Sequence, residues 1–282
     1  MKTLSNAHTH TTHCDGKSTA AEQVAAAQAL GFVSLGFSGH AMQGFDWLYC
    51  MSVEGQRAYR EELLALRESL RQSGSALRLW IGLEQDSLVP EAEKAANREL
   101  FEYRIGSTHY FPEPLDGAWV AVDGSAELLT RFIAERFDGD ATAMAQAYFA
   151  LHGQAVEHDR PEIVGHFDLV RKYAAGIGLD VHNRAYRDAA LAALAQARKG
   201  CGVLEVNTGN IARGYDTHPY PADFILDAWR DLDGELTLTS DCHNARDLDC
   251  AFAPTLEHLR ALGWTRLLRL GTGEALWEDV RL

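Results

Sequence analysis

Short apolar runs alternate with longer stretches of helical period along most of this chain of 282 residues. Apolar runs of about four to eight residues between turn signals are typical of buried strands, so each run predicts one strand. A further strand candidate lies at Arg266–Leu270. The seven strands predicted with it are Leu4–His8, Phe32–Ser38, Leu79–Glu84, Tyr103–Thr108, Ile163–His166, Val203–Asn207 and Leu236–Ser240.

Helical stretches separate most of these runs. Ser18–Leu30 begins with Ser and Thr, which cap helix N-termini, and it ends at Gly31, a typical C-terminal residue. Glu54–Ser73 carries leucines on one face, and the alanine-rich segment Asp188–Lys199 ends before a glycine. Each stretch is therefore predicted to form a helix.

The alternation of strands and helices predicts a parallel sheet. Seven or eight such units in one unbroken chain favour an α/β fold with a closed or distorted (β/α) barrel, built as a single domain over residues 1–282. Residues 123–159 are longer than a simple crossover, and we expect two helices joined by a turn at Phe137–Asp140. This helical insertion before the fifth strand is expected to lie over the mouth of the barrel.

Composition excludes several classes of protein. A formal net charge of −14 repels a polyanion, so nucleic acid is not an expected partner. The five cysteines form no CxxC pair, which indicates neither a disulfide framework nor a zinc ribbon and favours the reducing cytoplasm. The opening residues lack the apolar segment of a signal peptide, and no apolar run approaches the roughly 20 residues that span a bilayer, so no membrane association is expected.

Residue types that bind metals end six of the seven predicted strands between Leu4 and Ser240, and the exception is the sixth, which ends in LEVNTG. A lone histidine at a strand end is usually a core or surface residue, but the same chemistry at so many strand ends indicates one shared site. In (β/α) barrels the active site lies at the C-terminal ends of the strands. The candidate ligands, which also include one aspartate in the opening loop, are His8, His10, Asp15, His40, Glu84, His109, His166, Asp241 and His243.

Spacing places some of these candidates on one side of the chain. Residues two apart in an extended segment point the same way, so His8 with His10, and Asp241 with His243, can each supply two ligands. Nitrogen and carboxylate ligands suit zinc, iron or manganese. Nine ligands exceed the needs of one ion. We therefore expect two or three divalent transition-metal ions, with Glu84 as a bridging carboxylate.

The same residues carry a resemblance to a known family. The segments HTHTTHCDGKS, GFSGH, GLE, GSTHY, GHFDLVRKY, LEVNTG and TSDCH follow one another between residues 8 and 243. In this order they resemble the PHP (polymerase and histidinol phosphatase) superfamily. GHFDLVRKY followed by LEVNTG, together with the two-helix segment before GHFD, is similar to its monofunctional histidinol-phosphatase branch.

The resemblance implies a distorted (β/α)7 TIM-like barrel with a trinuclear metal centre. One metal would be held by His8, His10, Glu84 and Asp241, a second by Glu84, His109 and His166, and a third by Asp15, His40 and His243. Two positions depart from many relatives. Gly39 stands where an aspartate is common, and Cys242 stands where an alanine is common.

The implied activity is hydrolysis of L-histidinol phosphate to L-histidinol and phosphate in histidine biosynthesis. Clustered metals lower the pKa of bound water to about 7 and clamp phosphoryl oxygens, so we expect a metal-bridging hydroxide to attack phosphorus in line with the leaving alkoxide. Two alternatives stay open: a PHP phosphoesterase for another small ester, such as a nucleotide or sugar phosphate, and a non-catalytic metal-binding module. An amidohydrolase is disfavoured, because no strand end at a metal position supplies a lysine.

Cations are needed beside the metals to bind phosphate. Arg171 follows the fifth strand and Arg213 the sixth, and a guanidinium can bind phosphate through two hydrogen bonds. Lys17, in the opening loop, is a third candidate, although all three could be solvated loop residues.

Other side chains have less specific roles. The aromatic residues Phe45, Trp47 and Tyr49 could cover an imidazole ring or simply pack in the core. His152 and His158 fall on predicted helices and are expected to face solvent. The oligomeric state does not follow from the sequence.

Overall fold

The computed structural model describes residues 4–46 and 48–282. Its strands are β1 Ser5–Asn6, β2 Ser34–Phe37, β3 Arg78–Asp86, β4 Tyr103–Ser107, β5 Ile163–Val164, β6 Val203–Asn207, β7 Glu235–Thr239, β8 Arg266–Leu270 and β9 Trp277–Arg281. Its α-helices are α1 Ala20–Leu30, α2 Val53–Gln72, α3 Glu91–Leu100, α4 Ala126–Arg136, α5 Ala141–Asp159, α6 Ala174–Ile177, α7 Arg184–Ala197, α8 Gly209–Ala212, α9 Asp223–Asp231 and α10 Phe252–Ala261. Two short 3₁₀ helices are η1 Leu169–Tyr173 and η2 Ala245–Asp247.

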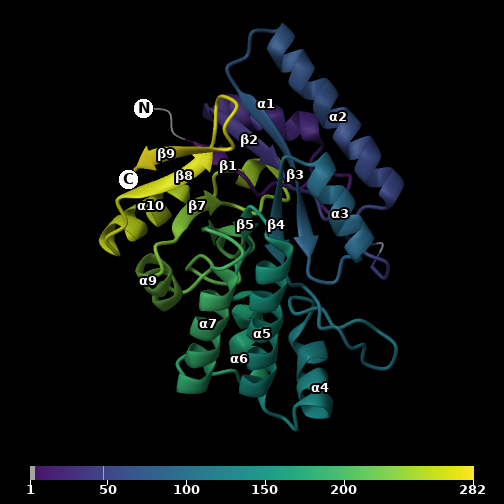
Figure 1. Cartoon of the computed structure of the whole chain (residues 1–282), viewed down its shortest axis with the longest axis vertical. Coiled ribbons are helices and arrows are strands. Elements are labelled where there is room, and N and C mark those ends of the chain that lie inside the picture. Colours follow the sequence, from purple (N-terminus) through teal and green to yellow (C-terminus); the bar gives the residue numbers. More distant parts are fainter. Residues whose placement is uncertain (1–3, 47) are drawn as a thin grey trace.

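The strands form one curled sheet in chain order, β1 to β9. Neighbouring strands are parallel except β8 and β9, which are antiparallel. The sheet curls far enough that the segments after β1 and β7 meet, since Thr9 forms a parallel bridge with Cys242. The fold is thus α/β with a mostly parallel, half-barrel sheet, compatible with a TIM-like barrel. Figure 1 shows helices outside the sheet, with α4, α5, α6 and α7 gathered at one end of the molecule.

Most predicted elements are present, with changed bounds. The strands at Val203–Asn207 and Arg266–Leu270 have the predicted limits, whereas β1 and β5 are only two residues long. Strand β9 was not predicted. Its sequence, WEDVR, is largely polar, and it is held to β8 by backbone pairing and by ion pairs such as Arg266 to Asp279, 2.6 Å. An edge strand of this kind leaves no apolar run in the sequence.

The local signals for helix ends act as expected. Thr19 caps α1 in a capping box with Glu22, and Gly31 ends the helix with φ 76°, a conformation that glycine adopts without strain. Between β4 and β5, helices α4 and α5 are joined through residues 137–140, where Asp140 accepts hydrogen bonds from the first amides of α5. Helix α5 packs against α7. The expectation that His152 on α5 faces solvent is wrong, because this side chain is completely buried in that packing.

Tyr103 of β4 is a large, completely buried side chain that packs in a small apolar cluster with residues that include Ala7 and Trp80. The hydroxyl of Tyr103 donates to the carbonyl oxygens of Ala7 and Phe37, at 2.6 and 3.0 Å. A Cβ atom on Gly36 or Gly82 would lie within 2.6 Å of the Tyr103 ring or hydroxyl, so these strands approach it only because they carry glycine. Parallel strands anchored in this way present their C-terminal ends together.

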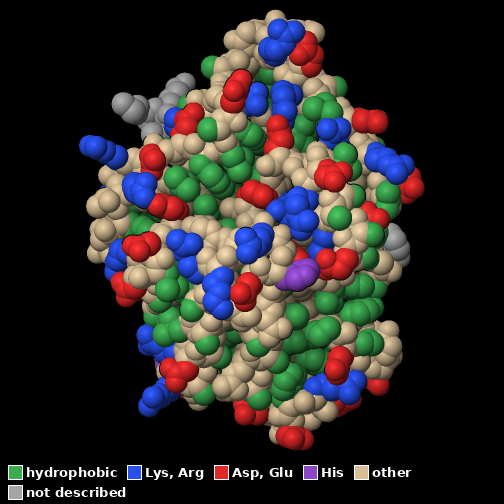
Figure 2. All heavy atoms as spheres, viewed as in Figure 1, with side chains coloured by type: hydrophobic (Ala, Val, Ile, Leu, Met, Phe, Trp, Pro, Cys, Tyr) green, Lys and Arg blue, Asp and Glu red, His purple; other side chains and the backbone are tan. Residues whose placement is uncertain are grey.

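The surface contrasts with this interior. Acidic and basic side chains are interspersed over the face seen in Figure 2, and histidine is scarcely visible on it. No helix among residues 4–46 and 48–282 combines the length and the apolar character needed to cross a membrane. Seven of the nine candidate ligands are buried, and Asp15 and His243 are half-buried.

Candidate metal centre

All nine candidate ligands come together at the C-terminal ends of the strands. Seven of them line one cavity, whereas His8 and His10 are completely buried and do not line it. Backbone hydrogen bonds bring their segments together: the amide of His10 donates to the carbonyl of Cys242 at 2.8 Å, and the amide of Cys242 donates to that of His8 at 3.0 Å. In the same way the amide of Ala41 donates to the carbonyl of Glu84 at 2.8 Å. The segments after β1, β2, β3 and β7 are therefore in register with one another at this edge.

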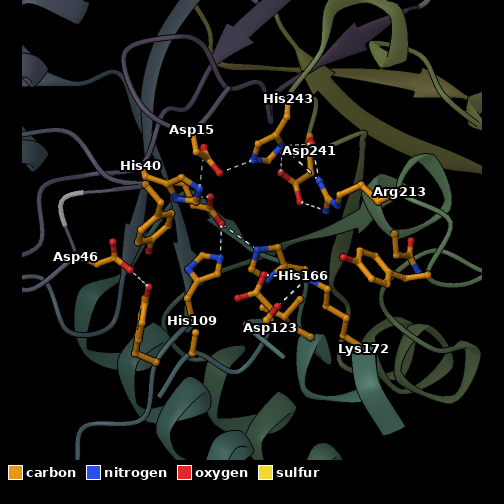
Figure 3. Close-up of a pocket in the computed structure, with 18 of the residues that line it drawn as sticks. Asp15, His40, Asp46, His109, Asp123, His166, Lys172, Arg213, Asp241 and His243 are labelled. Carbon is orange, nitrogen blue, oxygen red and sulfur yellow. Dashed lines mark hydrogen bonds and ion pairs between the residues drawn. The ribbon is translucent and has the colours of Figure 1, made fainter. Parts of the chain in front are cut away.

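Glu84 lies at the centre of the cluster, with only 2% of its surface exposed. Five histidine rings surround its carboxylate. Oε2 lies 3.2, 3.4 and 3.0 Å from ring nitrogens of His8, His10 and His40. Oε1 lies 2.9 and 3.3 Å from the Nε2 atoms of His166 and His109. Figure 3 shows rings from both sides of the cavity directed toward this centre.

Two aspartates complete the cluster on the side of the cavity formed by the opening loop and the segment after β7. Asp241 Oδ1 lies 3.2 Å from His10 Nε2 and 3.5 Å from His243 Nδ1. Asp15 Oδ2 lies 3.1 Å from His243 Nε2, and its Oδ1 lies 3.5 Å from His40 Nε2. The spacing of two residues thus brings Asp241 and His243 to the same centre as the other ligands.

The chemistry of this cluster fits divalent metal ions. Four of its buried polar atoms have no hydrogen-bond partner among the described residues: His8 Nε2, His10 Nε2, Asp15 Oδ1 and His166 Nδ1. Donor atoms converge within 4.8 Å of one another in three overlapping groups, which are His10, Asp15, His40 and His243; His8, His10 and Glu84; and His40, Glu84 and His109. These groups overlap the three sets that the family resemblance implies. They differ in three ways: His10 joins the Asp15 group, Asp241 is in none of the groups, and His40 rather than His166 lies with Glu84 and His109.

Electrostatics give Glu84 and His10 the protonation states that a metal requires. Burial would lower the pKa of His8 and of His109, but the neighbouring carboxylates raise both well above the ordinary value. Burial would raise the pKa of Glu84, but His8, His109 and His40 lower it well below its ordinary value. Burial, together with His243 and His40, lowers the pKa of His10 to about 3. The carboxylate is therefore charged and the His10 imidazole neutral near pH 7, as metal binding requires.

A buried carboxylate on β6 was missed by the sequence reasoning. Glu205 accepts hydrogen bonds from His8 Nδ1 at 2.9 Å, the amide of His166 at 2.5 Å, Asn207 Nδ2 at 2.9 Å and Thr239 Oγ1 at 2.8 Å. A carboxylate that accepts from one ring nitrogen fixes the other nitrogen toward the metal. The available signal was a glutamate between Leu and Val in an apolar strand, because a buried charge needs partners.

Asp86 has the corresponding role on β3. It accepts a hydrogen bond from the amide of His109 at 2.6 Å and from His109 Nδ1 at 3.2 Å, which leaves Nε2 of that ring facing Glu84. Asp86 lies two positions after Glu84 in the same strand. Since side chains two apart in a strand point to the same side, the sequence could have predicted that Asp86 faces the same side of the sheet as Glu84.

The cavity has a volume of about 440 Å³. Of the two arginines predicted to bind phosphate, only one lines it. Arg213 lines it and donates to Asp241 Oδ2 at 2.8 Å. Arg171 does not line it, since its guanidinium is bound by Asp168 at 2.9 Å, by Asp216 and by the carbonyl of Pro219 at 2.7 Å.

Two lysines also differ in whether they line the cavity. Lys172, which sequence reasoning did not single out, lines the cavity in place of Arg171. Lys17 is exposed and is not among the cavity-lining residues. The cationic contribution from the segment after β5 therefore comes from the lysine of the pair Arg171-Lys172.

The aromatic residues of the loop after β2 also differ in whether they line the cavity. The ring of Tyr49 lies 4.2 Å from that of His40 and lines the cavity, whereas Phe45 stacks on Trp119 at 4.0 Å. Trp47 lies outside the described residues.

Gly39, which stands where many relatives have an aspartate, has little space around it for a side chain. A Cβ atom on Gly39 would lie 3.2 Å from Met51 Cε and 3.3 Å from Cys14 Sγ. An aspartate at this position would need both neighbours to move.

Two curated proteins are similar to this chain over 93% of its length. A protein of Deinococcus radiodurans named "Probable histidinol-phosphatase" is 28% identical over 271 residues, which cover 93% of this chain and 95% of that protein. A protein of Schizosaccharomyces pombe with the same name is 23% identical over 93% of this chain and 86% of its own length.

Two solved structures share the fold. A Listeria monocytogenes protein assigned as the histidinol phosphatase HisK superposes with a TM-score of 0.76 at 20% identity, covering 89% of this chain and 99% of that one. The histidinol phosphate phosphatase of Lactococcus lactis, solved with zinc, L-histidinol and phosphate, superposes with a TM-score of 0.64 at 19% identity, covering 95% and 97%. The PHP domain model matches residues 6–209. This chain belongs to the PHP domain family.

Proposed function

We propose that the protein is a metal-dependent phosphomonoesterase that hydrolyses L-histidinol phosphate to L-histidinol and phosphate, a step of histidine biosynthesis. The observation that carries the proposal is the buried cluster of histidines and carboxylates around Glu84, which forms the floor of an open cavity. Both curated relatives bear the name of this activity, and the Lactococcus structure holds zinc, L-histidinol and phosphate.

The proposal extends to the architecture and the metals. The chain is a single domain, a distorted (β/α)7 barrel whose helical insertion at about residues 123–159 precedes the fifth strand. The nine ligands, which converge on Glu84, would hold two or three zinc, iron or manganese ions. The free cysteines fit a protein that works in the reducing cytoplasm.

When bound, such ions supply a water of lowered pKa and neutralise phosphoryl oxygens. The chain contributes the rest. Arg213 places its guanidinium beside Asp241, where it can bind phosphoryl oxygens in the transition state. Lys172 adds a second cation to the lining of the cavity. Glu205 keeps the His8 ring in the tautomer that directs Nε2 inward.

The test couples metal analysis to turnover. The purified protein is expected to contain at least two equivalents of zinc, iron or manganese, and to hydrolyse L-histidinol phosphate with a higher kcat/KM than nucleotide or sugar phosphates. Removal of the metals with a chelator is expected to abolish turnover, and added metal to restore it. Full turnover after chelation, or a higher kcat/KM for a nucleotide or sugar phosphate, would contradict the proposal.

A further inference from the structure

Two carboxylates line the cavity without belonging to the nine ligands, and they differ in what already binds them. Asp46 has a donor on each oxygen, because the hydroxyl of Tyr110 donates to Oδ2 and the amide of Leu48 donates to Oδ1 at 3.1 Å. The carboxylate of Asp123 accepts from Lys172 Nζ at 3.1 Å through Oδ2, and no hydrogen bond among residues 4–46 and 48–282 ends on its Oδ1. Asp123 therefore offers the cavity an acceptor that nothing described in the chain uses.

The position of Asp123 is fixed by the chain around it. An antiparallel bridge between Tyr110 and Ala121, and a hydrogen bond of 2.7 Å from the amide of Val122 to the carbonyl of His109, bring it beside the metal ligands. Its own carbonyl accepts from Lys172 Nζ at 2.9 Å. Figure 3 shows the carboxylate next to His166, facing into the cavity. A held carboxylate loses little conformational entropy when a ligand binds.

The surroundings of Asp123 define the ligand chemistry. Lys172 lies 4.5 Å above the ring of Tyr215, so an anion and a cation stand side by side on one wall. About a third of the Asp123 side chain is exposed, at 35%. A ligand complementary to this wall carries a cationic hydrogen-bond donor close to an anion. A primary ammonium next to a phosphate ester has this arrangement, and its N–H groups match a carboxylate acceptor.

We propose that Asp123 is a specificity-determining residue that binds the ammonium group of the substrate, and so selects phosphate esters of amino alcohols over esters without an amine. The inference rests on the proposed phosphatase function and deepens it. The free oxygen of Asp123 accepts from the ammonium, while Lys172 keeps the carboxylate in place and stands beside the ester.

The decisive measurement is a selectivity ratio. It is kcat/KM for L-histidinol phosphate divided by kcat/KM for the same imidazolyl-propanol phosphate without the amine. Asp123→Asn keeps the shape of the side chain and removes the charge. The ratio is expected to fall about 10- to 100-fold, mainly through KM for the amine ester, because a charge-assisted hydrogen bond is lost.

Two controls separate direct binding from a structural effect. Lys172→Met removes the partner and leaves the carboxylate, so it can slow both esters but is expected to keep or raise the ratio. Asp116→Asn, at an exposed site outside the cavity, is expected to change neither ester. The inference is overturned if Asp123→Asn leaves the ratio unchanged, or if Lys172→Met lowers it as much as Asp123→Asn does.

A second substrate pair distinguishes failure of the inference from failure of the proposed function. Phosphoethanolamine and ethyl phosphate differ by the amine alone and need no imidazole site. If histidinol phosphate is not hydrolysed, the proposed substrate is wrong, but a preference for phosphoethanolamine that Asp123→Asn abolishes still supports the inference. An equal preference in wild type and Asp123→Asn on this pair contradicts it. An enzyme that hydrolyses none of the four esters refutes both.

Discussion

Replacement of Glu205 by glutamine probes how the chain prepares His8 for metal. Each carboxylate oxygen of Glu205 accepts two hydrogen bonds: Oε2 from His8 Nδ1 and Thr239 Oγ1, and Oε1 from the His166 amide and Asn207 Nδ2. A glutamine keeps one acceptor and places an NH₂ group against two former donors. If that NH₂ faces His8, the ring must accept at Nδ1 and carry its proton on Nε2, the atom directed at Glu84 and Asp241.

The magnitude follows from these contacts. A protonated Nε2 cannot bind a metal, so the ring must rotate, change tautomer or give up its ligand role. Loss of such a supporting carboxylate typically costs 10- to 100-fold in metal affinity, which corresponds to about 1.4 to 2.8 kcal/mol. We expect Glu205→Gln to fold, to lose affinity for at least one metal by this factor, and to lose kcat at low metal concentration.

The assay is competition for zinc with a chelator of known affinity, supported by metal content after dialysis. Glu61→Gln, the same change at an exposed position of α2, is the matched control and is expected to bind metal as the wild type does. Unchanged competition and metal content in Glu205→Gln would refute the reasoning that Glu205 orients His8.

Further predictions concern charged and titrating side chains. Arg171→Ala is expected to lower the free energy of unfolding in urea by about 3 kcal/mol, since it leaves the buried Asp168 unpaired, while the KM of the folded fraction changes little; a large rise in KM without destabilisation would restore Arg171 as a phosphate ligand. Arg213→Lys is expected to lower kcat about 10- to 1000-fold through loss of planar, paired donors, and an unaltered kcat would exclude it from the chemistry. Burial lowers the pKa of His152 to about 3, against about 6.5 in the unfolded chain. Because only the unfolded chain gains this proton between those pH values, stability falls as pH falls from 6.5 toward 3, by up to about 1.4 kcal/mol per pH unit from this group. His152→Gln should remove that contribution from the pH dependence of unfolding, and identical pH profiles for variant and wild type would disprove it.

Much of the candidate site could be predicted from local sequence patterns. The alternation of side chains along a strand predicts that His8 and His10 point to one side, and the structure has both rings against Glu84. Chemistry at the ends of parallel strands predicts a shared cavity, because those ends meet at one edge of a sheet. These inferences depend only on backbone periodicity and on the topology that the alternation of strands and helices requires.

Neighbouring residues with similar chemistry were not distinguishable in this way. Arg171 and Lys172 are adjacent on a short 3₁₀ helix, and the turn points one toward Asp168 and the other into the cavity. No periodic rule covers such a turn, since a shift of one residue reverses which side chain faces inward. The choice of arginine over lysine was therefore wrong about which cation lines the cavity.

Apolar periodicity and strand-end chemistry are local properties, so the α/β class and the order of the candidate ligands along the chain could be predicted from the amino-acid sequence. The partners of each side chain could not be predicted, because they come from other parts of the fold. Glu205 became the support of His8, and Asp123 kept one oxygen free for the cavity, through contacts between segments far apart in the chain. Hydrogen bonds and burial depend on the distance between folded segments, and that distance is set by packing of the whole sheet and its helices.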